Sequence, residues 1–156
     1  MAGMEIIDFE PRFAGAFKAL NEAWISRYYE IEAKDHAILG DPQGAILDPG
    51  GHVFFSVEGD EAIGCCALIP MTDGGFELVK MAVAETSRGK GSGRALMAAC
   101  VERARELGAP RVYLESGLAL KPALSLYRSF GFVDVPPARR PPSPYARVEV
   151  WMELRL

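Results

Sequence analysis

The spacing of hydrophobic residues in the first third of the chain predicts one strand followed by one long helix. Ile6, Ile7 and Phe9 suggest the strand. Apolar side chains then recur every three or four residues from 12 to 30, which indicates an amphipathic helix. Residues 31–48 are less regular, and we expect at most a short helix there before Pro42 and Gly44 interrupt it.

Three strands are predicted next, in quick succession. They cover residues 53–58, 63–70 and 76–84. The turns between them carry Gly59-Asp60 and Asp73-Gly74-Gly75, which are residues typical of tight turns. This part of the chain is therefore expected to form an antiparallel meander.

A helical period returns after residue 90. Apolar residues form one face of a helix over 91–107, which Gly108 and Pro110 terminate. A strand at 112–114, a short helix at 122–130 and a strand at 132–135 follow. A proline-rich loop over 136–147 leads to a last alternating strand at 148–154, expected to be antiparallel to its neighbour. This order predicts an α/β (α+β) fold in which one mixed sheet carries helices on its faces.

Composition and charge narrow the class of protein. The chain has 156 residues, of which 49% are hydrophobic and 24% charged, which fits a single domain over residues 1–156 with a real core. The formal net charge is -4, whereas a nucleic-acid-binding domain usually presents a basic face. We therefore expect no nucleic-acid partner, and a weak preference for cationic small molecules.

The cysteines and the apolar runs indicate a cytoplasmic protein. Cys65, Cys66 and Cys100 show no CxxC spacing and are interpreted as reduced thiols. No apolar run approaches the roughly 20 residues that a membrane span needs, so no membrane partner is expected. No cluster of histidine, cysteine or carboxylate has metal-ligand spacing, and no metal is predicted.

The strongest candidate for chemistry is the glycine-rich stretch Arg88-Gly89-Lys90-Gly91-Ser92-Gly93-Arg94, between a strand and a helix. Glycines let backbone N–H groups converge, and a helix N-terminus favours anions, so this turn predicts a phosphate cradle. It is not a Walker A loop, which would need glycine at position 84 and Ser or Thr at 91. It is not a dinucleotide GxGxxG either, because the third glycine would fall on Arg94 or Leu96.

Two segments together resemble a known family. The stretch from Arg88 to Gly93 is similar to the pyrophosphate motif of the GNAT superfamily of N-acetyltransferases. Ala123-Leu124-Ser125-Leu126-Tyr127-Arg128-Ser129-Phe130-Gly131-Phe132 is similar to a second motif of that family, at the usual separation. The resemblance covers roughly residues 53–132. It implies a mostly antiparallel sheet of six to seven strands flanked by about four helices, an acetyl-CoA cofactor and a homodimer.

The resemblance also implies where acetyl-CoA binds. The strands at 77–84 and 112–114 should splay into a V that admits the pantetheine arm, with N–H groups from 89 to 94 on the pyrophosphate. Ser116 stands where many relatives carry asparagine. The cofactor-binding residues expected are Met81, Ala82, Val83, Arg88, Gly89, Lys90, Gly91, Ser92, Gly93, Arg94 and Ser116.

Two catalytic residues are expected. Deprotonating an ammonium of pKa ~10.4 at pH 7 costs about 4.6 kcal/mol, so a general base is useful, and Glu77 matches the position of the base in related histone acetyltransferases. Tyr127 resembles the family's general acid for the departing thiol. Because proton transfer from tyrosine to a thiolate is uphill by roughly 2 kcal/mol, we expect it first to hydrogen-bond the sulfur. The alternatives are a surface carboxylate and a core tyrosine.

The acceptor is expected between residues 28–39 and 136–147, with Tyr28, Tyr29 and Tyr145 as candidate walls. Arg139 and Arg140 could meet a substrate carboxylate; otherwise they are solvated. His36 is a second candidate there, whereas His52 is interpreted as structural. The function expected is acetylation of the primary amine of a small molecule, such as an amino acid or polyamine. A protein N-acetyltransferase and a non-catalytic acyl-CoA-binding module are the alternatives.

Overall fold

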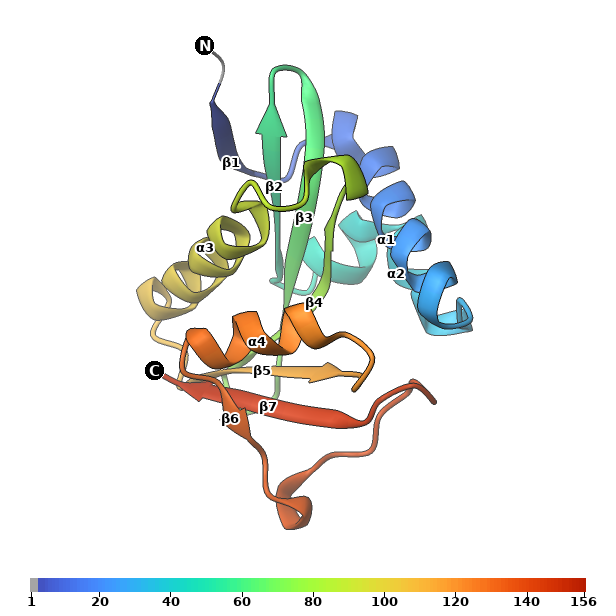
Figure 1. Ribbon diagram of the computed structural model, residues 1–156. Helices are drawn as coiled ribbons and strands as arrows, with labels where there is room; N and C mark the ends of the chain where they lie inside the picture. The colour runs from blue at the N-terminus through green and yellow to red at the C-terminus, as the bar shows by residue number, and fades with distance from the viewer. Residues whose placement is uncertain (1–2) are drawn as a thin grey trace.

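A computed structural model describes residues 3–156 and shows a seven-stranded sheet in the order β1-β2-β3-β4-β5-β7-β6 (Figure 1). Only the pair β4–β5 is parallel among the described strands. The predicted meander and the antiparallel last strand are confirmed. The strands are β1 Met4–Asp8, β2 His52–Glu58, β3 Glu61–Pro70, β4 Phe76–Val83, β5 Arg111–Ser116, β6 Val133–Asp134 and β7 Val150–Arg155.

Helices cover both faces of the sheet (Figure 1). The helices α3, Ser92–Glu106, and α4, Lys121–Ser129, lie over one face and share one hydrophobic cluster with it. The helices α1, Ala14–Tyr28, and α2, Ala33–Gly40, cover the other face with a second cluster. The four expected helices are thus present in the described part of the chain, in the expected order.

Several element boundaries differ from those predicted. Phe9 lies beyond the end of β1, β6 is shorter than expected, and β7 begins at Val150 rather than at residue 148. Pro42 starts a π-helical turn over Gln43–Leu47 instead of only breaking a helix, because its φ of -62° suits the first position of a helical turn.

A β-bulge in β4 decides which face each of its side chains reaches. Cys65 and Ala67 of β3 pair with Ala82 and Val79, so β4 holds one extra residue between them. Lys80 lies in that interval with φ 55°, in the left-handed region. Before the bulge Leu78 belongs to the α3 cluster, and after it Ala82 belongs to the α1 cluster. The bulge therefore inverts the alternation along β4, since a one-residue shift exchanges the two faces.

The parallel strands β4 and β5 separate after two residue pairs. Phe76 pairs with Val112 and Glu77 with Tyr113, and the register stops there. β5 instead pairs along its whole length with β7. The remainder of β4 thus leaves one backbone edge open toward β5, which confirms the predicted V.

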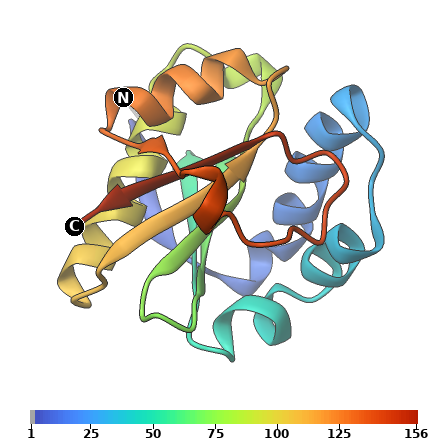
Figure 2. The same cartoon turned by 90° about the horizontal axis from the view of Figure 1, so that it is seen from below.

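The proline-rich segment between β6 and β7 crosses from the sheet toward α1 and α2 (Figure 2). Its far end is attached to α2, because the Arg147 guanidinium donates two hydrogen bonds of 2.8 Å to the Asp35 carboxylate. The segment therefore borders the opening between β4 and β5 on the α2 side.

Candidate functional site

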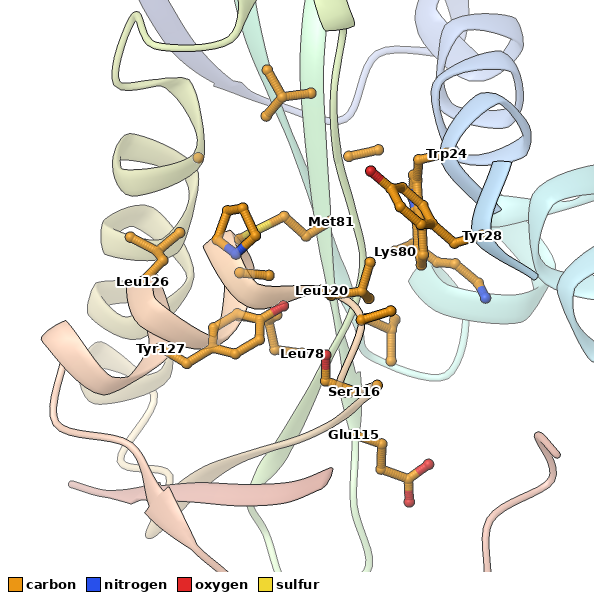
Figure 3. Close-up of a pocket in the computed structure, with 18 of the residues that line it drawn as sticks. Trp24, Tyr28, Leu78, Lys80, Met81, Glu115, Ser116, Leu120, Leu126 and Tyr127 are labelled. Carbon is orange, nitrogen blue, oxygen red and sulfur yellow. The ribbon is translucent and has the colours of Figure 1, made fainter. Parts of the chain in front are cut away.

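A cavity of about 490 Å³ fills the gap between β4 and β5 (Figure 3). One side is formed by α4, with Leu126 and Tyr127, and the opposite side by α1, with Trp24 and Tyr28 (Figure 3). Most of the residues predicted to form the site line it: Glu77, Met81, Ala82, Val83, Arg88, Gly89, Gly91, Ser92, Gly93, Ser116 and Tyr127.

The glycine-rich turn forms one end of the cavity. Gly89 and Gly91 have φ of 83° and 82°, and Gly91 is the N-cap of α3 without any side-chain cap. The first-turn N–H groups of α3 therefore have no capping side chain, and such groups attract anions. The Ser92 hydroxyl lies 2.5 Å from the Ser56 hydroxyl in the core, so it does not cap the N–H groups of the first turn. These features fit a pyrophosphate.

Two basic residues of the turn point elsewhere. The Lys90 ammonium lies 3.5 Å from the Glu58 carboxylate, and Arg94 donates to the Ser129 hydroxyl at 3.0 Å. Neither side chain lines the cavity. The structure thus places Arg88 at the cavity, and Lys90 and Arg94 beside it.

The middle of the cavity is mostly apolar, and the Ser116 hydroxyl is one of its few polar groups. Met81 and Val83 face the α3 and α4 side because of the bulge, opposite Leu120 and Leu126. Ser116 ends β5 and is 9% exposed, and its hydroxyl has no hydrogen-bond partner within residues 3–156. This hydroxyl is free to bond a polar group of a long, mostly apolar ligand arm.

Tyr127 projects from α4 into the cavity (Figure 3). It is 7% exposed, and its ring packs on Phe132 with centroids 6.1 Å apart. Burial, and then the nearby Cys66 thiol, raise the pKa of Tyr127 above its usual range. The hydroxyl therefore keeps its proton at neutral pH and acts as a hydrogen-bond donor.

Glu77 reaches the cavity from β4, at the last residue pair before the strands separate. Its carboxylate makes no ion pair with any described residue. Burial, and then the charge of Glu115, raise the pKa of Glu77 to about 7, although Lys80 and Lys34 oppose the shift. A carboxylate of that pKa is half ionised near neutrality, which suits a general base.

A buried ionic cluster beside Glu77 was not predicted. The Lys80 ammonium lies 2.5 Å from Asp35 and donates to the Tyr145 hydroxyl at 3.1 Å, while Arg147 binds the same carboxylate. Although burial opposes ionisation, the hydrogen bonds from Arg147 and Lys80 hold the pKa of Asp35 below its usual range. The only sequence signal for this cluster is Lys80 itself, a charged residue between the apolar residues Val79 and Met81 of β4.

The acceptor side of the cavity matches part of the sequence prediction. Tyr28, Tyr29 and Tyr145 line it, as expected, together with Trp24 and Arg147. The two histidines lie outside it: His36 is exposed on α2, and the His52 Nδ1 lies 3.1 Å from the Arg103 guanidinium.

Arg139 and Arg140, proposed from the sequence to meet a substrate carboxylate, do not line the cavity. Arg139 donates to the Glu153 carboxylate at 2.7 Å, and Arg140 donates to the Val135 carbonyl at 2.9 Å. The physical reason is that Glu153 is only 2% exposed and needs cationic partners of its own.

The described residues give little support for a disulfide, a metal site or a membrane-spanning helix. All three cysteines are free and buried. Among residues 3–156, no group of three or more histidine, cysteine or carboxylate side chains is arranged to hold a metal ion. None of the helices described has the length and apolar character needed to cross a membrane.

The chain is similar to known acetyltransferases. The model of the acetyltransferase (GNAT) family matches residues 15–132. The N-acetyltransferase YjgM of Escherichia coli K12 is 31% identical over 126 residues, which are 71% of this chain and 75% of that protein. A GNAT-family acetyltransferase of Staphylococcus aureus Mu50 superposes with a TM-score of 0.89 at 17% identity, covering 98% of this chain and 99% of the other.

A further structure, yncA of Salmonella typhimurium with its cofactor acetyl-CoA, has a TM-score of 0.77 at 17% identity, covering 97% and 93% of the two chains. The mixed sheet that opens beside a glycine-rich helix N-terminus defines an acyltransferase fold. The chain belongs to the acetyltransferase (GNAT) family and is an enzyme of the N-acetyltransferase class.

Proposed function

We propose that this enzyme uses acetyl-CoA to acetylate the primary amine of a small molecule, and that residues 1–156 form one acetyltransferase domain. One observation carries the proposal. A single cavity joins the uncapped N-terminus of α3 to the unpaired Glu77 carboxylate through the gap between β4 and β5. The acetyl-CoA in the yncA structure supports the choice of cofactor.

The glycine-rich turn and the open edge of β4 would hold different parts of acetyl-CoA. Backbone N–H groups from Gly89 to Arg94, including those of Lys90 and Ser92, would bind the pyrophosphate, with the Arg88 charge nearby. The open backbone edge of β4 over residues 81–83 would bond the pantetheine amides as a strand does, and Ser116 would add a hydroxyl. When bound, acetyl-CoA supplies an acyl group as a thioester.

Two side chains on opposite sides of the cavity are assigned to the reaction, one as the base and one as a hydrogen-bond donor. The Glu77 carboxylate accepts a proton from the acceptor ammonium, directly or through one water, which leaves a nucleophilic amine. The Tyr127 hydroxyl donates a hydrogen bond to the leaving sulfur and stabilises its developing negative charge. A tyrosine whose pKa is raised by burial is a poor acid but a persistent donor, which fits this order of events.

The acceptor end supports a small molecule rather than a protein chain. The segment that precedes β7 is tied across this end by three contacts. Ser143 donates to Glu115 at 2.7 Å, Tyr145 accepts from Lys80, and Arg147 binds Asp35. An extended peptide would need an open groove at this place. The cytoplasmic location and the homodimer remain predictions of the sequence.

Thermal unfolding with acetyl-CoA, followed by thiol release with a panel of amines, tests this function. Cofactor at a hundredfold its Kd should stabilise the protein by about 2.7 kcal/mol, and amines should release free coenzyme A. Failure of saturating acetyl-CoA to raise the melting temperature would overturn cofactor binding. A rise with thiol release only from peptides would replace the small acceptor with a protein acceptor.

A further inference from the structure

The charged side chains on the acceptor half of the cavity are unequally paired. Its two cations, Lys80 and Arg147, both bind the Asp35 carboxylate, and Arg147 also lies 3.4 Å from the Glu32 carboxylate, so two carboxylates offset the two cations. Its two carboxylates, Glu77 and Glu115, make no ion pair with any residue between 3 and 156, although both line the cavity. The unneutralised charge offered to an acceptor is therefore negative.

Glu115 is held in place by neutral groups. Its two oxygens accept hydrogen bonds from the Tyr113 hydroxyl and the Ser143 hydroxyl, each at 2.7 Å. Neutral donors orient a carboxylate without cancelling its charge, so Glu115 keeps its attraction for a cation. Its side chain points away from Tyr127 (Figure 3).

The two carboxylates have a spacing set by the sheet. Glu77 pairs with Tyr113, and Glu115 lies two residues further along β5 on the same face. With strands about 4.8 Å apart at that pair and a rise of about 3.3 Å per residue, the Cα atoms of Glu77 and Glu115 lie at least roughly 8 Å apart, because β5 diverges from β4 beyond it. Two cationic groups joined by a few methylenes match that spacing.

The surrounding walls suit an aliphatic cation. Trp24, Tyr28 and Tyr145 line this half of the cavity, and the Lys80 ammonium already lies 4.8 Å from the Tyr145 ring centroid. Aromatic faces attract ammonium groups and cover methylenes. A substrate carboxylate, in contrast, would meet two uncompensated carboxylates and two cations that already bind Asp35.

We propose that the acceptor is a short aliphatic diamine, with one amine at Glu77 and the remote ammonium bound by Glu115. This inference rests on the proposed acetyl transfer. Glu77 takes one proton from the near ammonium, the amine nitrogen forms a bond to the acyl carbon, and the carbon–sulfur bond breaks with its electron pair going to sulfur. The second proton that the nitrogen loses passes to that sulfur, so the products are the amide and the free thiol of coenzyme A. The remote ammonium keeps its protons and serves only for recognition.

Three acceptors test the assignment: putrescine, butylamine and γ-aminobutyrate, which share a primary amine and a chain and differ at the remote end. At about pH 8.5 Glu77 is ionised. We expect kcat/KM for putrescine to exceed that for butylamine about tenfold or more, and γ-aminobutyrate to be poorer than butylamine. A tenfold preference corresponds to 1.4 kcal/mol. Equal rates with putrescine and butylamine, or a preference for γ-aminobutyrate, would overturn the diamine.

The variant Glu115→Gln should abolish the preference for putrescine over butylamine, which is read as the ratio of their kcat/KM values on one preparation. Glu102→Gln, on the exposed face of α3, is the matched control and should keep the preference. Loss of butylamine and putrescine turnover together would overturn the recognition role of Glu115. The acceptor series on the unmodified enzyme decides the question if Glu115→Gln does not fold. No thiol release from any of the three amines would overturn the proposed function itself.

Discussion

The Lys80 ammonium and the Asp35 carboxylate lie 2.5 Å apart, with side chains 4% and 0% exposed. Lys80 is the residue at positive φ in the β4 bulge, a conformation that costs a non-glycine residue roughly 1–2 kcal/mol. The bulge turns the lysine side chain toward α2, where its ammonium binds the Asp35 carboxylate. Because Arg147 binds the same carboxylate, one aspartate joins β4, α2 and the segment before β7 at the wall of the cavity.

Removing the Asp35 charge should destabilise the protein strongly. Asp35→Asn leaves the buried Lys80 ammonium without its carboxylate, whereas Arg147 keeps Glu32 at 3.4 Å, and breaking a buried pair in this way costs about 3–5 kcal/mol. Urea unfolding measures the change. Asp134→Asn, on the exposed strand β6, is the control and should stay within about 0.5 kcal/mol of the original protein. A loss below about 1 kcal/mol for Asp35→Asn would show that the cluster does not hold these elements together.

The acidic limb of the pH–rate profile should report Glu77. A general base must be ionised, so kcat/KM should fall as the pH drops through the Glu77 pKa of about 7. Glu77→Gln should lower kcat/KM by roughly 10²–10⁴-fold and remove this limb. If the Glu77→Gln variant keeps the acidic limb of the profile, that limb reports the ionisation of another group.

Two substitutions should move that limb in opposite directions. The Glu115 charge raises the pKa of Glu77, so Glu115→Gln should shift the limb to lower pH. The Lys80 charge lowers the pKa of Glu77, so Lys80→Met should shift it to higher pH. Steady-state rates from pH 5 to 9 distinguish the two signs (a range chosen about the Glu77 pKa). Shifts in the same direction would indicate a change of structure instead of charge.

Tyr127→Phe should reduce turnover without weakening cofactor binding. The hydroxyl acts on the leaving sulfur, so kcat should fall by roughly 10²-fold or more, while the acetyl-CoA-dependent rise in melting temperature should persist. Thiol release and thermal unfolding measured on the same samples separate these effects. An unchanged kcat would leave Tyr127 as a packing residue of α4.

Two glycines with the same backbone conformation allow a matched test of the phosphate cradle. Gly91 lines the cavity with φ 82°, whereas Gly108 ends α3 with φ 73°, and a Cβ at either would have open space. Alanine at each should cost a similar 1–2 kcal/mol through backbone strain. We expect only Gly91→Ala to reduce the stabilisation by acetyl-CoA. Equal stabilisation of both variants would argue against the cradle.

The sequence by itself determined the element order, the glycine-rich turn and the two candidate catalytic residues. These features are local: the period of apolar residues depends on the neighbours along the chain, and a glycine pair before a helix predicts its own backbone conformation. Tyr127 and Glu77 could be named because they occupy recognisable positions within such local segments.

Only the tertiary structure decided how the cavity is charged. The extra residue in β4 depends on its pairing with β3, and it reverses the faces of Met81 and Ala82 without any mark in the sequence. Asp35, Lys80 and Arg147 are far apart along the chain, and a buried charge acquires its partner only when the fold brings that partner within hydrogen-bond distance. The same holds for Glu115, which lines the cavity without an ion-pair partner among residues 3–156 because the neighbouring cations Lys80 and Arg147 bind Asp35 instead.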